Sequence, residues 1–127
     1  MQKYLIKDIH IVNEGIIRVG DVLLSNGRIE RIDSQISATQ GAVIEIDAKG
    51  KYLLPGVIDD QVHFREPGLT HKANIYTESK AAVAGGTTSF MEMPNTVPAV
   101  LTQELLEDKY QIGAHTSLAN YSFFMVR

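Results

Sequence analysis

One stretch of the sequence decides the fold: Pro55-Gly56-Val57-Ile58-Asp59-Asp60-Gln61-Val62-His63-Phe64-Arg65-Glu66-Pro67-Gly68. The β-branched residues near its start, bounded by turn signals, predict that it begins as a buried strand. Side chains alternate along a strand, so four polar side chains are expected on one face: Asp59, Gln61, His63 and Arg65. A hydrophobic core does not accept such a row, because each buried polar group needs a partner. The row therefore indicates a site wall at the carboxyl end of a strand, where (β/α) barrels carry their catalytic residues.

The composition is that of an ordinary globular domain. The chain has 127 residues, of which 44% are apolar and 21% are charged, enough for one hydrophobic core. Its net charge of -3 provides no basic surface for nucleic acid or an anionic membrane. Cysteine is absent, which excludes disulfides and thiolate metal sites and fits a reducing compartment. Because we recognise no signal peptide and no membrane-spanning stretch, we expect a cytoplasmic protein.

Residues 1–50 are predicted to be all-β. Asn26-Gly27 lies between apolar alternating runs and is a strong hairpin signal. The apolar or alternating runs predict strands at residues 5–6, 9–12, 16–24, 29–33 and 42–47. A hairpin-rich meander of this size has open edges and little core of its own, so we expect it to pack against another element.

After Lys51 the pattern changes to strands that alternate with helices. The predicted elements are a strand from residue 57, a helix from 75 to a stop at Gly85-Gly86, a strand at 87–93, a helix from its N-cap Thr102 to Gly113 or Ala114, and a strand at 117–125. This order implies parallel pairing with right-handed crossovers. A closed (β/α)8 barrel needs about 250 residues. The chain is therefore either a small open α/β domain or the front portion of something larger.

Four motifs carry a resemblance to a known family: Pro55-Gly56-Val57-Ile58-Asp59, Val62-His63-Phe64-Arg65-Glu66-Pro67-Gly68, Gly85-Gly86-Thr87-Thr88 and Met93-Pro94-Asn95-Thr96. Together they strongly resemble dihydroorotase, a cyclic-amide hydrolase of the amidohydrolase superfamily, over about residues 1–125. The resemblance implies that residues 1–50 are half of a composite β-sandwich. It also implies that residues 51–127 are the first three strands and two helices of a metal-bearing, TIM-like (β/α)8 barrel. We therefore expect a truncated gene product or a fragment of a dihydroorotase.

The family reaction interconverts N-carbamoyl-L-aspartate and (S)-dihydroorotate in de novo pyrimidine (UMP) biosynthesis, with Zn2+ activating a water and polarising the amide carbonyl. The resemblance implies that His63 is a metal ligand. It also implies that His63, Phe64 and Arg65 line the substrate, and that Arg65 and Asn95 hold its carboxylate. Guanidinium and amide donors suit that task. Asp59 is expected to orient its neighbours through hydrogen bonds rather than to bind metal directly.

The chain departs from the family pattern in two respects. Gln61 stands where the family has the first of two His ligands, and an amide oxygen is a poor zinc ligand. The remaining ligands, and the Asp that shuttles the proton, belong to later strands, so no catalytic residue is expected within this chain. Zinc sites generally use at least three protein ligands, and His63 is the single conventional candidate. One or two zinc ions are expected in a complete enzyme, and little activity from this chain alone.

Several alternatives remain open at this point. From the pattern alone, His63 could be a satisfied polar residue, Arg65 a surface ion pair and Asn95 a turn residue. The protein could be a non-catalytic dihydroorotase-like partner in an assembly, with a carbamoyltransferase or with further copies of itself. It could also be a related cyclic amidase such as allantoinase or dihydropyrimidinase. Arg65 argues against dihydropyrimidinase, because it favours a substrate with a carboxylate.

Overall fold

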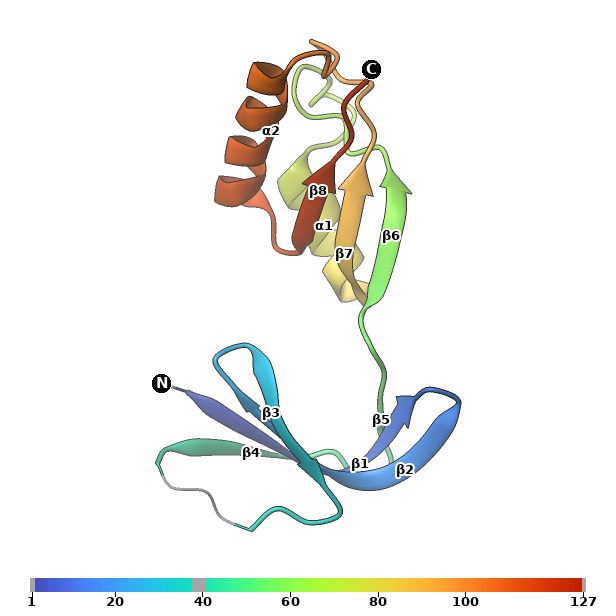
Figure 1. Cartoon of the computed structure of the whole chain (residues 1–127), viewed down its shortest axis with the longest axis vertical. Coiled ribbons are helices and arrows are strands. Elements are labelled where there is room, and N and C mark those ends of the chain that lie inside the picture. The colour runs from blue at the N-terminus through green and yellow to red at the C-terminus, as the bar shows by residue number, and fades with distance from the viewer. Residues whose placement is uncertain (1, 38–40, 127) are drawn as a thin grey trace. The chain divides into compact units, whose positions relative to one another are not determined.

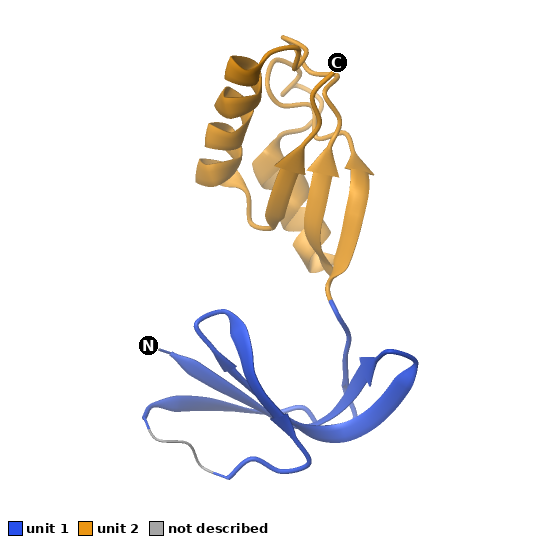
Figure 2. Cartoon of the chain, in the orientation of Figure 1, with its two compact units in different colours: residues 1–55 blue, residues 56–127 orange. Residues whose placement is uncertain are grey.

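The computed structural model describes residues 2–37 and 41–126. The chain divides into two compact units, Met1–Pro55 and Gly56–Arg127 (Figure 2). The first unit extends beyond the predicted boundary at residue 50. The reason is that Tyr52 and Leu53 form a short strand that pairs with the first strand of the chain.

The first unit is a five-stranded sheet in the order β3-β2-β1-β4, with β5 also paired to β1 (Figure 1). Its strands are β1 (Lys3–Asn13), β2 (Ile16–Ser25), β3 (Arg28–Asp33), β4 (Val43–Asp47) and β5 (Tyr52–Leu53). The first three pair antiparallel, whereas β4 and β5 run parallel to β1. The predicted meander is wrong beyond β3, because the next connection returns the chain to the start of β1 instead of turning back along β3.

The two hairpins follow from backbone conformations that the sequence favours. Asn26 and Gly27 both have positive φ, 54° and 70°, as do Glu14 and Gly15, at 50° and 74°. Two successive residues in the left-handed region match the right-handed twist of the flanking strands. The Asn-Gly hairpin prediction is therefore confirmed.

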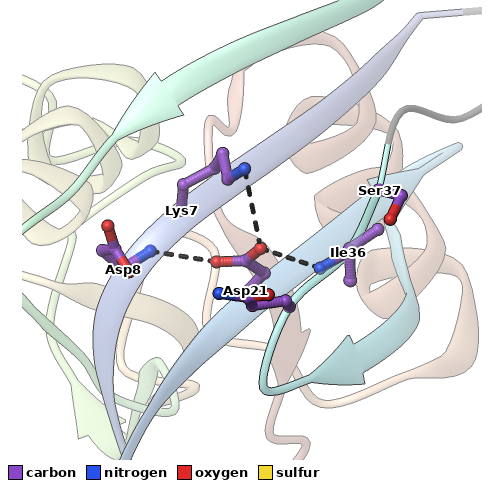
Figure 3. Close-up of a pocket in the computed structure, with 6 residues that line it drawn as sticks. Lys7, Asp8, Asp21, Ile36 and Ser37 are labelled. Carbon is purple, nitrogen blue, oxygen red and sulfur yellow. Dashed lines mark hydrogen bonds and ion pairs between the residues drawn. The ribbon is translucent and has the colours of Figure 1, made fainter.

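A buried carboxylate, Asp21, fixes an irregularity in β1 (Figure 3). Asp8 has a φ of 55°, and the pairing of β1 with β2 shifts at this point, so the two runs predicted separately form one bulged strand. Asp21 accepts hydrogen bonds from the backbone N–H of Asp8 at 3.1 Å and of Ile36 at 2.9 Å. The Lys7 ammonium lies 4.0 Å from the same carboxylate. Asp21 thereby links the bulge to the connection that follows β3.

The second unit is a three-stranded parallel sheet in the order β6-β7-β8 (Figure 1). Its elements are β6 (Val57–Val62), α1 (Ile75–Ala84), β7 (Thr87–Glu92), α2 (Gln103–Thr116) and β8 (Asn120–Phe123). The predicted alternation of strands and helices is confirmed, and so is the N-cap Thr102, whose side chain accepts from the Leu105 N–H. The predicted end of the second helix at Gly113 or Ala114 is wrong. Gly113 is buried inside α2, where a Cβ would lie 2.8 Å from the Tyr121 ring.

Both helices pack over one aromatic core. The buried cluster combines residues from the loop after β6, from α1, from β7 and from β8: Phe64, Ile75, Phe90 and Phe123. Leu106 and Tyr110 of α2 pack against it. The Phe64 and Phe90 rings lie 4.5 Å apart between centroids and are tilted, an arrangement that adds to the free energy of simple burial.

The edge strand β6 differs from the prediction of a buried strand. Val57 and Ile58 are 56% and 69% exposed, and β6 has a neighbour on one side only within the described sheet. Its pairing with β7 shifts between Asp59 and Val62, and the strand ends at Val62. Strict alternation therefore does not extend from Asp59 to Arg65, and the predicted single polar face does not hold.

Neither helix within residues 2–37 and 41–126 combines the length and the apolar character needed to cross a membrane.

The Asp21 network predicts acid sensitivity of the first unit. Burial on its own raises the pKa of the Asp21 carboxyl, but the N–H groups of Ile36 and Asp8, together with Lys7, outweigh it and hold the pKa below its ordinary value. The stability that this carboxylate contributes is present above the ordinary pKa of aspartate. It is lost as the pH falls through that value toward the lower pKa of the folded state.

The test is Asp21→Asn, with thermal unfolding followed at several pH values. At neutral pH the variant is expected to unfold at least about 4 °C below the wild type. Both carboxylate oxygens of Asp21 accept from backbone N–H groups, and the asparagine NH2 group, itself a donor, cannot replace one of them. The gap should narrow as the pH falls below the ordinary pKa of aspartate, because the wild-type carboxylate then becomes protonated as the pH approaches its lower pKa in the folded state. The control Glu45→Gln changes an exposed carboxyl on β4. A gap that stays constant with pH contradicts the assigned role.

Candidate functional site

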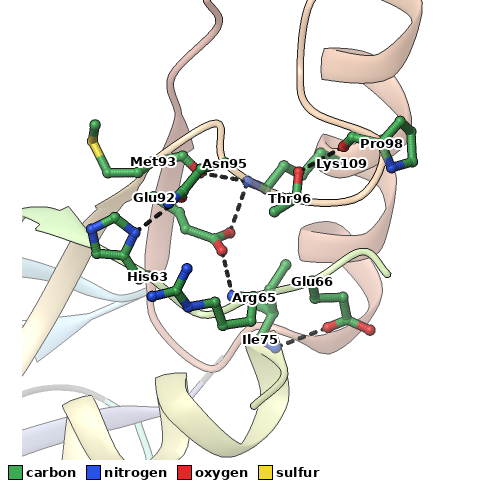
Figure 4. A network of polar contacts seen from close by, with 10 residues as sticks. All are labelled: His63, Arg65, Glu66, Ile75, Glu92, Met93, Asn95, Thr96, Pro98 and Lys109. Atoms are coloured by element: carbon green, nitrogen blue, oxygen red, sulfur yellow. Dashed lines mark hydrogen bonds and ion pairs between the residues drawn. The ribbon is translucent and has the colours of Figure 1, made fainter. Parts of the chain in front are cut away.

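The candidate site lies where β6 and β7 end (Figure 4). Backbone hydrogen bonds join the two loops that follow these strands. The Met93 N–H donates to the Val62 carbonyl at 3.0 Å, and the Val97 N–H donates to the Pro67 carbonyl at 3.1 Å. The first loop carries His63 to Gly68 and the second carries Met93 to Pro98. They therefore form one joined rim at the carboxyl ends of adjacent parallel strands, where sites occur in α/β folds.

The structure brings His63 and Asn95 into direct contact. His63 Nδ1 lies 3.0 Å from the Asn95 side-chain oxygen, and both residues are exposed. An amide oxygen only accepts hydrogen bonds, so the neutral tautomer that satisfies this contact donates from Nδ1 and has an unprotonated Nε2. The Asn95 NH2 group keeps its donors. The contact thus leaves the second imidazole nitrogen of His63 and the NH2 group of Asn95 available to a ligand.

Arg65 lies on the same rim in an unusual backbone conformation. Its φ is 71°, in the left-handed region that residues other than glycine seldom adopt. Figure 4 shows its side chain extending toward the side of the network on which His63 lies. It is half-buried, and among the described residues it takes part in no ion pair. Within the described residues, no carboxylate therefore balances the charge of this guanidinium.

A buried ion pair supports the rim from below. The Lys109 ammonium lies 3.1 Å from Glu92 Oε2, and both side chains are excluded from solvent, with exposures of 0% and 1%. Glu92 Oε1 accepts a hydrogen bond from the Arg65 backbone N–H at 2.9 Å, and Lys109 donates to the Met93 carbonyl at 3.1 Å. The Lys109 ammonium also lies 5.0 Å from the centroid of the Phe123 ring, within the range of a cation–π contact.

Burial perturbs both members of this pair. It raises the pKa of the Glu92 carboxyl, against the opposing effects of Lys109 and of the N–H groups of Arg65 and Phe64. It lowers the pKa of the Lys109 ammonium, against the opposing effect of Glu92. Each charge therefore depends on the other to remain ionised in the interior.

The remaining predicted site residues are placed differently. The Phe64 side chain is 8% exposed and packs in the aromatic core, and its predicted contact with the substrate stays a prediction. Asp59 accepts from the backbone N–H of Gln61 at 3.2 Å, and both residues are exposed. Gln61 lines an open depression of about 500 Å³ beside Met93 and Pro94. No group of three or more His, Cys, Asp or Glu residues within the described ranges is arranged to hold a metal ion.

The sequence analysis did not identify Glu92 and Lys109 as a pair. A signal existed, because Glu92 ends an otherwise apolar strand and Lys109 lies on the apolar face of the second predicted helix, beside Leu105 and Ile112. A lysine at such a position is usually assumed to extend its ammonium to water. The observation that two such charges face each other requires the three-dimensional structure.

Comparisons with known proteins agree on one family. A family model described as Dihydro-orotase-like matches residues 50–125. A dihydroorotase of Listeria welshimeri is 45% identical over 105 residues, which cover 82% of this chain and 24% of that protein. A dihydroorotase of Bacillus cytotoxicus is 40% identical over 128 residues, which cover 98% of this chain and 29% of that protein. The chain thus spans about a quarter of the length of these relatives.

Solved structures show the same fold. The L-hydantoinase (dihydropyrimidinase) of Arthrobacter aurescens matches with a TM-score of 0.89 and 26% identity, over 96% of this chain and 27% of that one. A dihydropyrimidinase of Brevibacillus agri matches with a TM-score of 0.80 and 30% identity, over 97% and 27%. These similarities confirm the predicted fold class, a β-rich first portion followed by β/α units of the amidohydrolase type.

The buried pair predicts a non-additive response to mutation. Lys109→Met leaves the Glu92 carboxylate buried without its partner and is expected to destabilise the second unit by about 3–5 kcal/mol. Adding Glu92→Leu should recover part of that loss, because it removes the unpaired buried charge, although the Arg65 N–H then loses its acceptor. The free energy of unfolding is measured in urea by far-ultraviolet circular dichroism, since within the described residues both helices belong to this unit.

A surface pair gives the matched control. Lys3 and Glu30 form an ion pair at 3.1 Å with side chains 27% and 44% exposed, and Lys3→Met should cost less than about 1 kcal/mol. Additive losses at Glu92 and Lys109 would contradict their coupling.

Proposed function

This chain belongs to the dihydroorotase-like family, and from that premise we propose that its loops form part of the active site of a dihydroorotase. The proposed reaction is the reversible hydrolysis of the cyclic amide of (S)-dihydroorotate to N-carbamoyl-L-aspartate, in pyrimidine biosynthesis and in the cytoplasm. The observation that carries the proposal is the joined rim of His63, Arg65 and Asn95. An imidazole, a guanidinium and an amide, presented together, suit a metal and a carboxylate-bearing substrate.

The proposed substrate contacts follow from the free donors of the rim. The Arg65 guanidinium would bind the substrate carboxylate through two parallel hydrogen bonds. The Asn95 NH2 would add a third, directional donor, because its oxygen is already engaged by His63. These contacts would fix the ring before reaction, and such positioning lowers the entropic part of the barrier.

The donor chemistry of His63 fits zinc, whereas that of Gln61 does not. His63 would hold the ion through Nε2, while the contact with Asn95 fixes its tautomer and ring orientation. When bound, zinc supplies a hydroxide at neutral pH and polarises the amide carbonyl. The amide oxygen of Gln61 is a weak ligand for this ion. We therefore assign one zinc ligand to this chain and leave Gln61 out of the ligand set.

The other parts of the site are proposed to lie outside this chain. The relatives are about four times as long as the stretch that matches, and catalytic zinc sites use three protein ligands with an open position. The further ligands and the proton-shuttling Asp would come from that additional length. Assembly with further copies or with a carbamoyltransferase is an additional possibility that this family context suggests for the whole protein.

The proposal that the site is divided is tested by assaying dihydroorotate hydrolysis with Zn2+. The 127-residue chain alone is compared with the chain joined to any continuation encoded in its reading frame. Turnover is expected from the longer protein only. Turnover by the 127-residue chain at the rate of the longer protein contradicts the proposal, and metal-free, inactive longer protein favours a non-catalytic role.

A second candidate is a hydantoinase-type amidase, favoured by the structural similarity to hydantoinases and dihydropyrimidinases. The two candidates differ in whether the substrate carries a carboxylate for Arg65. In the longer protein, Arg65→Met is expected to raise the KM for dihydroorotate about 10- to 100-fold, the equivalent of losing a charge-assisted hydrogen-bond pair.

The control is Arg18→Met, which changes an exposed arginine of β2 in the other unit. It should leave the KM unchanged. A KM for dihydroorotate that is insensitive to Arg65→Met, together with faster turnover of hydantoin or dihydrouracil, would move the assignment to the second candidate.

A further inference from the structure

The buried pair of Glu92 and Lys109 contacts both loops of the rim, each through one member. Glu92 holds the backbone N–H of Arg65 in the first loop, at 2.9 Å. Lys109 holds the carbonyl of Met93 at 3.1 Å, two residues before Asn95 in the second loop. The carboxylate and the ammonium lie 3.1 Å apart. A continuous polar connection therefore runs through the protein interior from the backbone of Arg65 to that of Met93, two residues before Asn95 (Figure 4).

A contribution to folding stability does not by itself explain why Glu92 and Lys109 are buried in the core of the second unit. Removing two charges from water carries a large desolvation penalty, and apolar side chains of similar volume often serve a core equally well. What apolar residues cannot provide is an acceptor for Arg65 and a donor for Met93. Arg65 needs that acceptor in particular, because its backbone lies at a φ of 71°, where a residue other than glycine is strained.

We propose that Glu92 and Lys109 are a positioning pair for substrate binding: Glu92 holds Arg65 in its left-handed conformation, and Lys109 fixes the start of the Asn95 loop relative to it. Neither side chain reaches substrate, since both are buried. The inference rests on the proposed function, because it assigns the pair to the carboxylate-binding part of that same site. Its consequence is that the spacing between guanidinium and amide is set by two residues that have no contact with the ligand.

The experiment compares two double variants that differ in one acceptor. Glu92→Gln with Lys109→Met removes both charges but keeps a side-chain oxygen for the Arg65 N–H. Glu92→Leu with Lys109→Met removes the charges and that oxygen as well. Both lack the Lys109 ammonium that donates to Met93. A difference between them in exchange or in KM therefore reports the hydrogen bond from the Arg65 N–H to residue 92. Both variants are made in the longer protein, the chain joined to any continuation encoded in its reading frame. Amide hydrogen exchange at Arg65, the melting temperature, and KM and kcat for dihydroorotate with Zn2+ are measured on each.

We expect both variants to be folded and their kcat values to agree within about threefold. The variant with Leu should exchange the Arg65 amide at least about tenfold faster and show a KM at least about tenfold higher, because small displacements of a positioning group are costly. A third variant, Glu92→Asp, keeps the charge but withdraws the acceptor by one methylene. It should shift KM in the same direction even if the Leu variant fails to fold.

Equal exchange at Arg65 in the Gln and Leu variants would overturn the proposal, as would equal KM values despite different exchange. A merely structural pair would alter the melting temperature and leave KM unchanged. Failure of the proposed function is seen separately, as a longer wild-type protein that does not turn over dihydroorotate. In that case unequal exchange would still support the hold on Arg65, and equal exchange would still refute it.

Discussion

The ion pair between Glu92 and Lys109 is the interaction on which the site depends. Two charges meet inside an otherwise aromatic core, and each makes one further hydrogen bond, to Arg65 or to Met93. Charges in such a place persist only when both are paired. The requirement ties α2, the end of β7 and the loop after β6 into one arrangement. The positions of the rim residues His63, Arg65 and Asn95 therefore depend on this buried ion pair.

Above that contact, a single amide links the two tasks of the proposed site. Asn95 uses its oxygen to fix the imidazole of His63 and keeps its NH2 for an anion. Its orientation thereby determines which nitrogen of His63 is free and which donors face the substrate. In the first unit, Asp21 has a comparable structural role, since one buried carboxylate satisfies two backbone N–H groups at an irregular point. In both units a buried carboxylate fixes backbone that regular pairing leaves unsatisfied.

The sequence predicted correctly those features of the fold that are determined by a few adjacent residues. The Asn26-Gly27 hairpin, the N-cap Thr102 and the alternation of strands and helices were all recognisable, because each depends on a few adjacent residues. Features that depend on distant residues were not. The parallel pairing of β4 with β1 requires a long-range return of the chain. Gly113 was taken as a helix end, whereas it makes room for the ring of Tyr121. The site residues came from family motifs, and their mutual contacts, above all the buried pair, came from the structure.

The most direct test of the account is a crystal structure of the protein with dihydroorotate bound. The account predicts the substrate carboxylate within hydrogen-bonding distance of both the Arg65 guanidinium and the Asn95 NH2, with the Arg65 N–H still bonded to Glu92. A carboxylate bound elsewhere, or an Arg65 turned away from the rim while Glu92 and Lys109 remain paired, would contradict it.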